Sequence, residues 1–186
     1  GDPKLPDQGN PQCLCVDRSG RLWVGTNGKG VYLYNRENDK FTQYLGDNSG
    51  ETLFGENIYK MCDYGDELVI GIHEGKLRKL NKRKNILTDV NAPEVHYKII
   101  RDVACFDDEL WVGTQSGVYV INELKNKISH IYNDPMCSYS LSDNQIGRIY
   151  RDRENGIWIG TNLGGVNYCP QRGIEFTRHI PLSRPY

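Results

Sequence analysis

A repeat of about 45 residues constrains this chain more than any other feature of its sequence. Each copy holds a hydrophobic triplet followed by glycine, and these glycines are Gly25, Gly71, Gly113 and Gly160. Their spacings are 46, 42 and 47 residues. This period is typical of β-propeller blades. We therefore predict an all-β fold of four tandem, four-stranded antiparallel blades.

Each copy divides into short apolar runs separated by Gly, Asn and Asp clusters, which is the pattern of successive hairpins. In the first copy we expect strands at 12–16, 22–26, 30–35 and 40–44, with a tight turn at Asn27-Gly28-Lys29. Later first strands are expected around Ile58, Ile100 and Ile146, and last strands near Leu87, Ile128 and Phe176. Within a single domain, 1–186, the expected blades are 10–46, 56–90, 98–133 and 144–180.

The residue types in the repeat fit blades that are covered on both faces. The triplets, such as Leu22-Trp23-Val24, do not alternate with polar residues, as expected of strands buried on both sides. The indole N–H of Trp23 then needs a hydrogen-bond acceptor. Gly25 and its equivalents are expected to allow the close approach of another backbone, whereas Gly30, Gly75, Gly117 and Gly165 are expected at a turn with positive φ or at a bulge.

The two outermost blades would leave apolar faces open, which a stable monomer avoids. We therefore expect the chain to be part of a larger propeller. A closed ring of four blades and self-association of such slices are the alternatives.

Composition excludes several classes of function. Lys and Arg number 23 and Asp and Glu number 24, and the resulting net charge of −1 argues against nucleic-acid binding. No run of 18 apolar residues occurs, so this segment is not expected to insert into a membrane. The six cysteines form no CxxC pair, and we expect most of them to be buried free thiols rather than a disulfide framework.

The segments DRSGRLWVGTNGKGVYLYN, from Asp17, and DRENGIWIGTNLGGVNYC, from Asp152, resemble the two-component regulator propeller repeat. The lead-in DPMCSYSLSDNQIGRIYRD, from Asp134, shares the resemblance. It covers essentially the whole chain and is weakest in the second copy, where Val69 replaces Trp and Ile72 replaces Thr.

The resemblance implies the extracytoplasmic, periplasmic sensor region of a Bacteroidetes-type hybrid two-component histidine kinase, whose kinase lies outside this chain. It also implies that the larger propeller has seven blades. It implies a carbohydrate signal, with an oligosaccharide or other small ligand as partner. Other blades and domains of the parent chain, and a homodimer, are the further partners that we expect. The chain itself is not expected to be an enzyme.

The motifs that suggest catalysis or metal binding have simpler explanations. GTNGKG, from Gly25, lies inside a hairpin and lacks the helix that a phosphate loop needs. Asp17 and Asp152 precede turns that an Asx side chain can cap. The histidines do not recur with the blades. We therefore expect no cofactor, no metal and no catalytic residues.

Ligands usually contact loops on a rigid scaffold, so we place a ligand at the turns between the second and third strands and at the long loops between blades. The candidate ligand-binding residues are Asn27, Lys29, His73, Gln115, Tyr139, Asn144 and Asn162. Two other functions remain alternatives: a protein-interaction scaffold, which no sugar would stabilise, and a propeller lyase or hydrolase, which would form product from a sugar.

Overall fold

The computed structural model describes residues 10–46, 52–72, 75–170 and 177–179, which form four successive four-stranded units. The first unit holds β1 (Asn10–Val16), β2 (Leu22–Lys29), β3 (Val31–Asn35) and β4 (Lys40–Tyr44). The second holds β5 (Phe54–Tyr64), β6 (Glu67–Ile72), β7 (Lys76–Asn81) and β8 (Leu87–Asp89). A short 3-10 helix, η2 (Pro93–Val95), leads to the third unit, β9 (Ile100–Phe106), β10 (Glu109–Thr114), β11 (Gly117–Asn122) and β12 (Lys127–Ile131). The fourth holds β13 (Ile146–Arg151), β14 (Ile157–Thr161), β15 (Val166–Cys169) and β16 (Thr177–His179).

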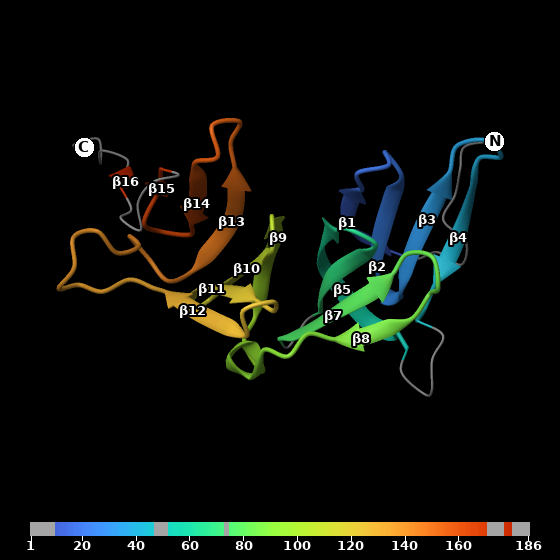
Figure 1. Ribbon diagram of the computed structural model, residues 1–186, viewed down its shortest axis with the longest axis horizontal. Helices are drawn as coiled ribbons and strands as arrows, with labels where there is room; N and C mark the ends of the chain where they lie inside the picture. The colour runs from blue at the N-terminus through green and yellow to red at the C-terminus, as the bar shows by residue number, and fades with distance from the viewer. Residues whose placement is uncertain (1–9, 47–51, 73–74, 171–176, 180–186) are drawn as a thin grey trace.

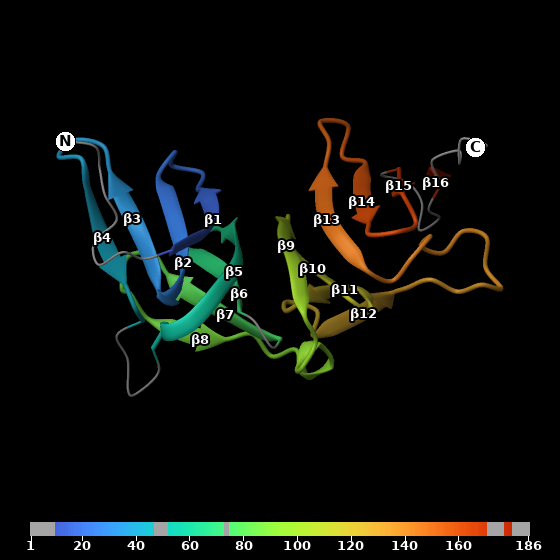
Figure 2. The ribbon, with the colours of Figure 1, turned by 180° about the vertical axis from the view of Figure 1, so that it is seen from behind.

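The units follow one another along an arc, and every strand pair is antiparallel (Figure 1). The first strand of each unit (β1, β5, β9 and β13, here called the inner strands) lies toward the middle of the arc, and neighbouring inner strands contact each other. The last strands, β4, β8, β12 and β16, lie outside (Figure 1). Seen from behind, β6 lies between β5 and β7 (Figure 2). This curled antiparallel arrangement is that of β-propeller blades.

The first two units share one sheet, which differs from the expected separation of the blades. The chain turns back where expected, since Thr26 N donates to Gly30 O at 3.1 Å. However, β2 continues through the expected turn to Lys29, because Asn27 and Lys29 pair with Asn57 and Phe54 at the start of β5.

Three apolar cores lie between successive units. Strand β6 shows how they form: Leu68 and Ile70 belong to the core between the first and second units, whereas Val69 belongs to the next core. Trp111 and Ile159 lie in the third core. The triplets of β6 and β10 are therefore buried from both sides, which confirms for these two strands the reason given for the lack of alternation. In the fourth unit, Trp158 is only partly buried.

A glycine of one unit accommodates an isoleucine from the inner strand of the following unit. A Cβ atom on Gly25 would lie 2.6 Å from Ile58 Cγ2, and one on Gly113 would lie 2.6 Å from Ile146 Cγ2. These glycines do allow a close approach, but the prediction of a backbone is wrong, because the approaching atoms belong to side chains. The four turn glycines, beginning with Gly30 at φ +73°, all have positive φ, as predicted.

The cysteine prediction is wrong for one pair, because Cys62 and Cys105 form a disulfide. The two residues lie on the adjacent inner strands β5 and β9. Cys15 and Cys169 are buried free thiols, as expected, but Cys137 is exposed.

Candidate functional site

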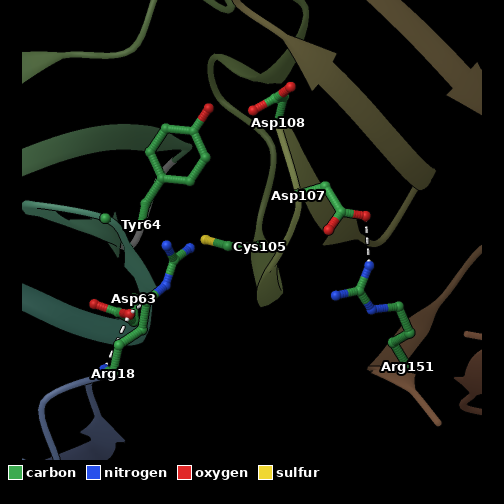
Figure 3. A pocket seen from close by; sticks show the side chains of 8 residues that line it. Arg18, Asp63, Tyr64, Cys105, Asp107, Asp108 and Arg151 are labelled. Atoms are coloured by element: carbon green, nitrogen blue, oxygen red, sulfur yellow. Dashed lines mark hydrogen bonds and ion pairs between the residues drawn. The ribbon is translucent and has the colours of Figure 1, made fainter. Parts of the chain in front are cut away.

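The turns that follow the inner strands enclose a polar cavity of about 750 Å³, here called the turn pocket. Figure 3 shows its charged side chains facing one another from all four units. Its lining consists of Arg18, Asp63, Tyr64, Gly65, Cys105, Asp107, Asp108 and Arg151. No single repeat could build this pocket, because each unit supplies only a part of it.

On one side of the turn pocket, the Asp63 carboxylate connects the first and second units. Its Oδ2 atom accepts a hydrogen bond from Arg18 N at 3.2 Å and lies 3.2 Å from Arg18 Nε. Its Oδ1 atom accepts from Lys82 Nζ at 2.5 Å, and the same amine donates to the Gly65 carbonyl. Because Lys82 is buried and Arg18 is 71% exposed, Lys82 is the fixed partner of Asp63 and Arg18 can exchange its partner.

On the opposite side, the third and fourth units meet through an arginine. Arg151 Nη1 donates to Asp107 Oδ2 at 2.6 Å (Figure 3). The Arg151 guanidinium also lies over the Phe106 ring, with its Cζ atom 5.1 Å from the ring centroid. Two contacts therefore position this cation, while the exposed Asp107 carboxylate keeps contact with solvent.

Tyr64 and Asp108 complete the pocket between these two ion pairs (Figure 3). Burial raises the pKa of the Tyr64 hydroxyl above its ordinary value, and the carboxylates of Glu123 and Asp108 raise it further. The hydroxyl therefore stays protonated at neutral pH and remains a hydrogen-bond donor. The disulfide that includes Cys105 joins β5, which ends at Tyr64, to β9, which precedes the turn that holds Asp108.

The turn pocket offers two guanidinium groups, three carboxylates and a phenol within one cavity. Guanidinium groups donate several hydrogen bonds and carboxylates accept several. Such a mixture suits a ligand that carries many hydroxyl groups, because each hydroxyl both donates and accepts.

Three of the residues predicted to bind ligand have hydrogen-bond partners within the chain. Gln115 Oε1 accepts from Ile99 N at 2.6 Å, and Asn144 Oδ1 accepts from Asn133 N at 2.7 Å. Asn162 Nδ2 donates to the Gln145 side chain at 3.2 Å. Gln115 and Asn162 thus fasten the loop entering the third or fourth unit to the turn between that unit's second and third strands. Asn144 instead bonds within the loop between β12 and β13.

The other candidates are spread over the arc. Asn27 is exposed on β2, and the Lys29 amine lies 5.3 Å from the centre of the Phe54 ring. Tyr139 is exposed in the loop between β12 and β13, in the opposite half of the arc (Figure 1). His73 lies outside the described residues. The structure therefore does not bring all the described candidates into one site.

Sequence reasoning missed the turn pocket. The signal was a charged residue at or just after the end of each inner strand, namely Arg18, Asp63, Asp107 and Arg151. Each of these charged residues alone is typical of an exposed turn. Only the arrangement of the four inner strands along the arc places the four residues around one cavity.

Within the described ranges, no three His, Cys, Asp or Glu side chains gather closely enough to hold a metal ion. The described part of the chain also lacks a helix of the length and hydrophobicity needed to cross a membrane.

Comparison with solved structures supports the class of fold. The β-propeller domain of a protein from Myceliophteria thermophila has a TM-score of 0.62 and 14% identity, over 86% of this chain and 51% of that one. The extracellular domain of the putative hybrid two component system BT4673 from B. thetaiotaomicron has a TM-score of 0.71 and 24% identity, over 88% of this chain and 22% of that one. The fold is that of β-propeller blades.

Comparison of the amino-acid sequence with known families and proteins gives two similarities. Residues 4–28 and 140–163 match the model of the two component regulator propeller. The chain is 28% identical over 179 residues to histidine kinase P4 of Formosa agariphila, with 92% of this chain aligned. It spans 13% of that relative's length. Two segments of the chain, in its first and last repeats, thus match the two-component regulator propeller.

Proposed function

We propose that this chain is a ligand-binding propeller segment of a two-component sensor, which signals to a histidine kinase located elsewhere in the parent protein. The observation that carries the proposal is the match of the first and last repeats to the regulator propeller, together with the alignment of nearly the whole chain to a histidine kinase. On this proposal the chain binds and transmits, and the kinase performs the chemistry.

The proposed location is outside the cytoplasm, in the periplasm. The disulfide between Cys62 and Cys105 supports it, because disulfides persist in oxidising compartments and are rare in the cytosol. The B. thetaiotaomicron neighbour is likewise an extracellular domain.

The proposed ligand is an oligosaccharide, and the turn pocket is its proposed site. The mixed donors and acceptors around Arg18, Tyr64 and Asp108 support a hydroxyl-rich ligand. Because four units contribute to the pocket, a ligand held there would contact all of them at once. Occupancy could then shift the packing between units, which is a population shift between receptor arrangements.

Further blades of the parent protein are the proposed neighbours of this segment. The apolar side chains of Leu14 and Val16 on β1, and of Leu163 and Val166 in the fourth unit, are exposed. Such surfaces suit contact with additional blades or with a second copy of the chain. A larger, seven-bladed propeller and a homodimer both stay predictions.

The first test is a glycan screen with the 186-residue chain, read as a rise in melting temperature. A ligand that binds only the folded state stabilises it by mass action. We expect an oligosaccharide to raise the melting temperature and Arg18→Ala to reduce that rise. Arg101→Ala is the matched control, because it removes the same charge from an exposed position outside the turn pocket.

Two results would contradict the proposal. One is the absence of any glycan that raises the melting temperature, or a rise that is equal in wild type and Arg18→Ala. The other is the detection of the native protein, with an antibody raised against this chain, in the cytosolic fraction of the cells. Formation of a product from the glycan would instead support a propeller lyase or hydrolase.

A further inference from the structure

A second set of polar side chains lies deeper along the inner strands, away from the turns. Each member occupies the position that pairs with the glycine after the hydrophobic triplet, so the four are equivalent in register. They are Cys13, Lys60, Asp102 and Arg148. With their neighbours they line a cavity of about 680 Å³, here called the axial cavity.

Asp102 is the buried anchor of this layer, with 3% of its surface exposed. Its Oδ2 atom accepts a hydrogen bond from Ile149 N at 2.7 Å. Its Oδ1 atom accepts from Arg148 Nη1 at 3.2 Å. Asp102 therefore joins the third unit to the fourth and holds the Arg148 guanidinium at the wall of the axial cavity.

Lys60 approaches the same carboxylate without hydrogen bonding to it. Its Nζ atom lies 3.9 Å from Asp102 Oδ1, and the side chain is 23% exposed. Among the described residues, no acceptor lies within hydrogen-bonding distance of this amine. A partly desolvated ammonium group with unused donors favours an anionic partner.

The charges of the layer do not cancel. Lys60 and Arg148 are cationic and Asp102 is the one carboxylate of the layer. Burial raises the pKa of the Cys13 thiol to about 11, although the nearby Lys60 ammonium opposes this, so the thiol is neutral at physiological pH. A positive charge therefore remains beside the axial cavity, where it is only partly hydrated.

We propose that the axial cavity binds the carboxylate of a small acidic ligand, with Lys60 and Arg148 contacting it and the Asp102 carboxylate competing with it for these two cations. A guanidinium presents parallel N–H donors that match a carboxylate, and an ammonium adds a compact charge beside them. The ligand class is an acidic sugar, and this part of the inference rests on the proposed function.

The test compares D-glucuronate with D-glucose, which differ at one carbon by a carboxylate. Both are titrated into the 186-residue chain at constant ionic strength, because salt screens the interaction. Binding is followed by NMR through the amide signal of Ile149, whose N–H donates to Asp102. Glucuronate is expected to shift this signal at lower concentration than glucose does.

Two variants should change glucuronate affinity in opposite directions. Lys60→Met should weaken it about tenfold, as expected for the loss of one charged hydrogen bond. Asp102→Asn keeps an acceptor for Ile149 N but removes the competing charge, so it should strengthen glucuronate binding while leaving glucose unaffected. Lys76→Met is the matched control, because Lys76 pairs with Glu56 and does not line the axial cavity.

The outcomes separate this inference from the proposed function. If glucose binds as tightly as glucuronate, or if Lys60→Met and Lys76→Met have equal effects, the inference is wrong and sugar binding stands. If Asp102→Asn only destabilises the fold and does not strengthen glucuronate binding, the layer is structural. If neither sugar binds, the carboxylate site is ruled out, and the glycan screen decides the proposed function independently.

Discussion

Asp17 Oδ2 lies 3.0 Å from the indole Nε1 of Trp23, six residues along the chain. The relationship recurs in the fourth unit, where Trp158 Nε1 donates to Asp152 Oδ2 at 2.7 Å. In both units the other carboxylate oxygen accepts a backbone N–H of the turn, from Arg21 in the first case. A single aspartate side chain thus caps the turn and accepts the indole N–H of the tryptophan.

Removing this carboxylate should destabilise the first unit more than the fourth. We expect Asp17→Ala to lower the free energy of unfolding by about 2–4 kcal/mol, because it leaves the N–H of the fully buried Trp23 without its acceptor. Asp152→Ala should cost less, because Trp158 is only partly buried. Urea unfolding of both variants measures the difference.

Trp23→Phe is the control for that pair, since it keeps a ring and removes the donor. In a double-mutant cycle, Asp17→Ala should cost less when Phe occupies position 23. Equal costs in both backgrounds would show that the hydrogen bond to the indole contributes nothing.

The same carboxylate predicts a dependence of stability on pH. Burial opposes the ionisation of Asp17, but hydrogen bonds from Trp23 and Arg21 outweigh it and hold the pKa below its ordinary value of 3.8. A lowered pKa in the folded state contributes stability above the unfolded pKa, and this contribution is lost as the pH falls through the folded value. We therefore expect wild type to lose stability below about pH 4.

Asp17→Asn cannot titrate, so its free energy of unfolding should fall less over the same acidic range. Urea unfolding at a series of pH values between about 5 and 2.5 measures this difference. If the free energy of unfolding fell with pH by the same amount in wild type and Asp17→Asn, Asp17 would not contribute to the pH dependence of stability.

The sequence was sufficient to predict the repeated features of the fold. A glycine such as Gly117 recurs at a fixed distance from each triplet, and its positive φ is a local requirement that a local pattern can reveal. The Asx cap at Asp17 is predictable for the same reason, because its partners at Ser19 and Arg21 lie within four residues.

The features that the sequence did not reveal depend on contacts between units. Cys62 pairs with Val69 and Cys105 pairs with Leu110, so the two cysteines occupy different registers in their repeats and no periodic pattern links them. The turn pocket likewise combines charges that are about 45 residues apart, such as Arg18 and Asp63. Only the packing of neighbouring inner strands makes these residues adjacent.

The glycine after the triplet should tolerate alanine in one unit and not in another. Gly25→Ala would place a Cβ atom 2.6 Å from Ile58 Cγ2 and 2.7 Å from Cys13 Sγ, so we expect a loss of about 1–3 kcal/mol. Gly160→Ala would meet no atom closer than the Arg148 carbonyl oxygen at 3.9 Å. It should be neutral or stabilising by up to about 1 kcal/mol.

Thermal unfolding of the two alanine variants checks this contrast. Neither glycine has positive φ, so backbone strain in the alanine variants does not contribute to the difference between them. An equal loss in both variants would show that the cost arises from the strand itself and not from the isoleucine of the following unit.

The disulfide should stabilise the junction between the second and third units. Cys62 and Cys105 are 43 residues apart, and closing a loop of this length in the unfolded chain is expected to contribute about 2–4 kcal/mol. The double variant Cys62→Ser/Cys105→Ser should therefore unfold at lower urea concentration than wild type. A reducing agent should destabilise wild type and leave the double variant unchanged.

Cys137→Ser is the control for this prediction, because Cys137 is an exposed free thiol. Its stability should match that of wild type, with and without reductant. Alkylation of the denatured, unreduced protein should label four cysteines, the free thiols Cys13, Cys15, Cys137 and Cys169. Labelling of all six cysteines would show that the bond is absent. The disulfide would then no longer support a location outside the cytoplasm, because an oxidising compartment would keep this pair closed.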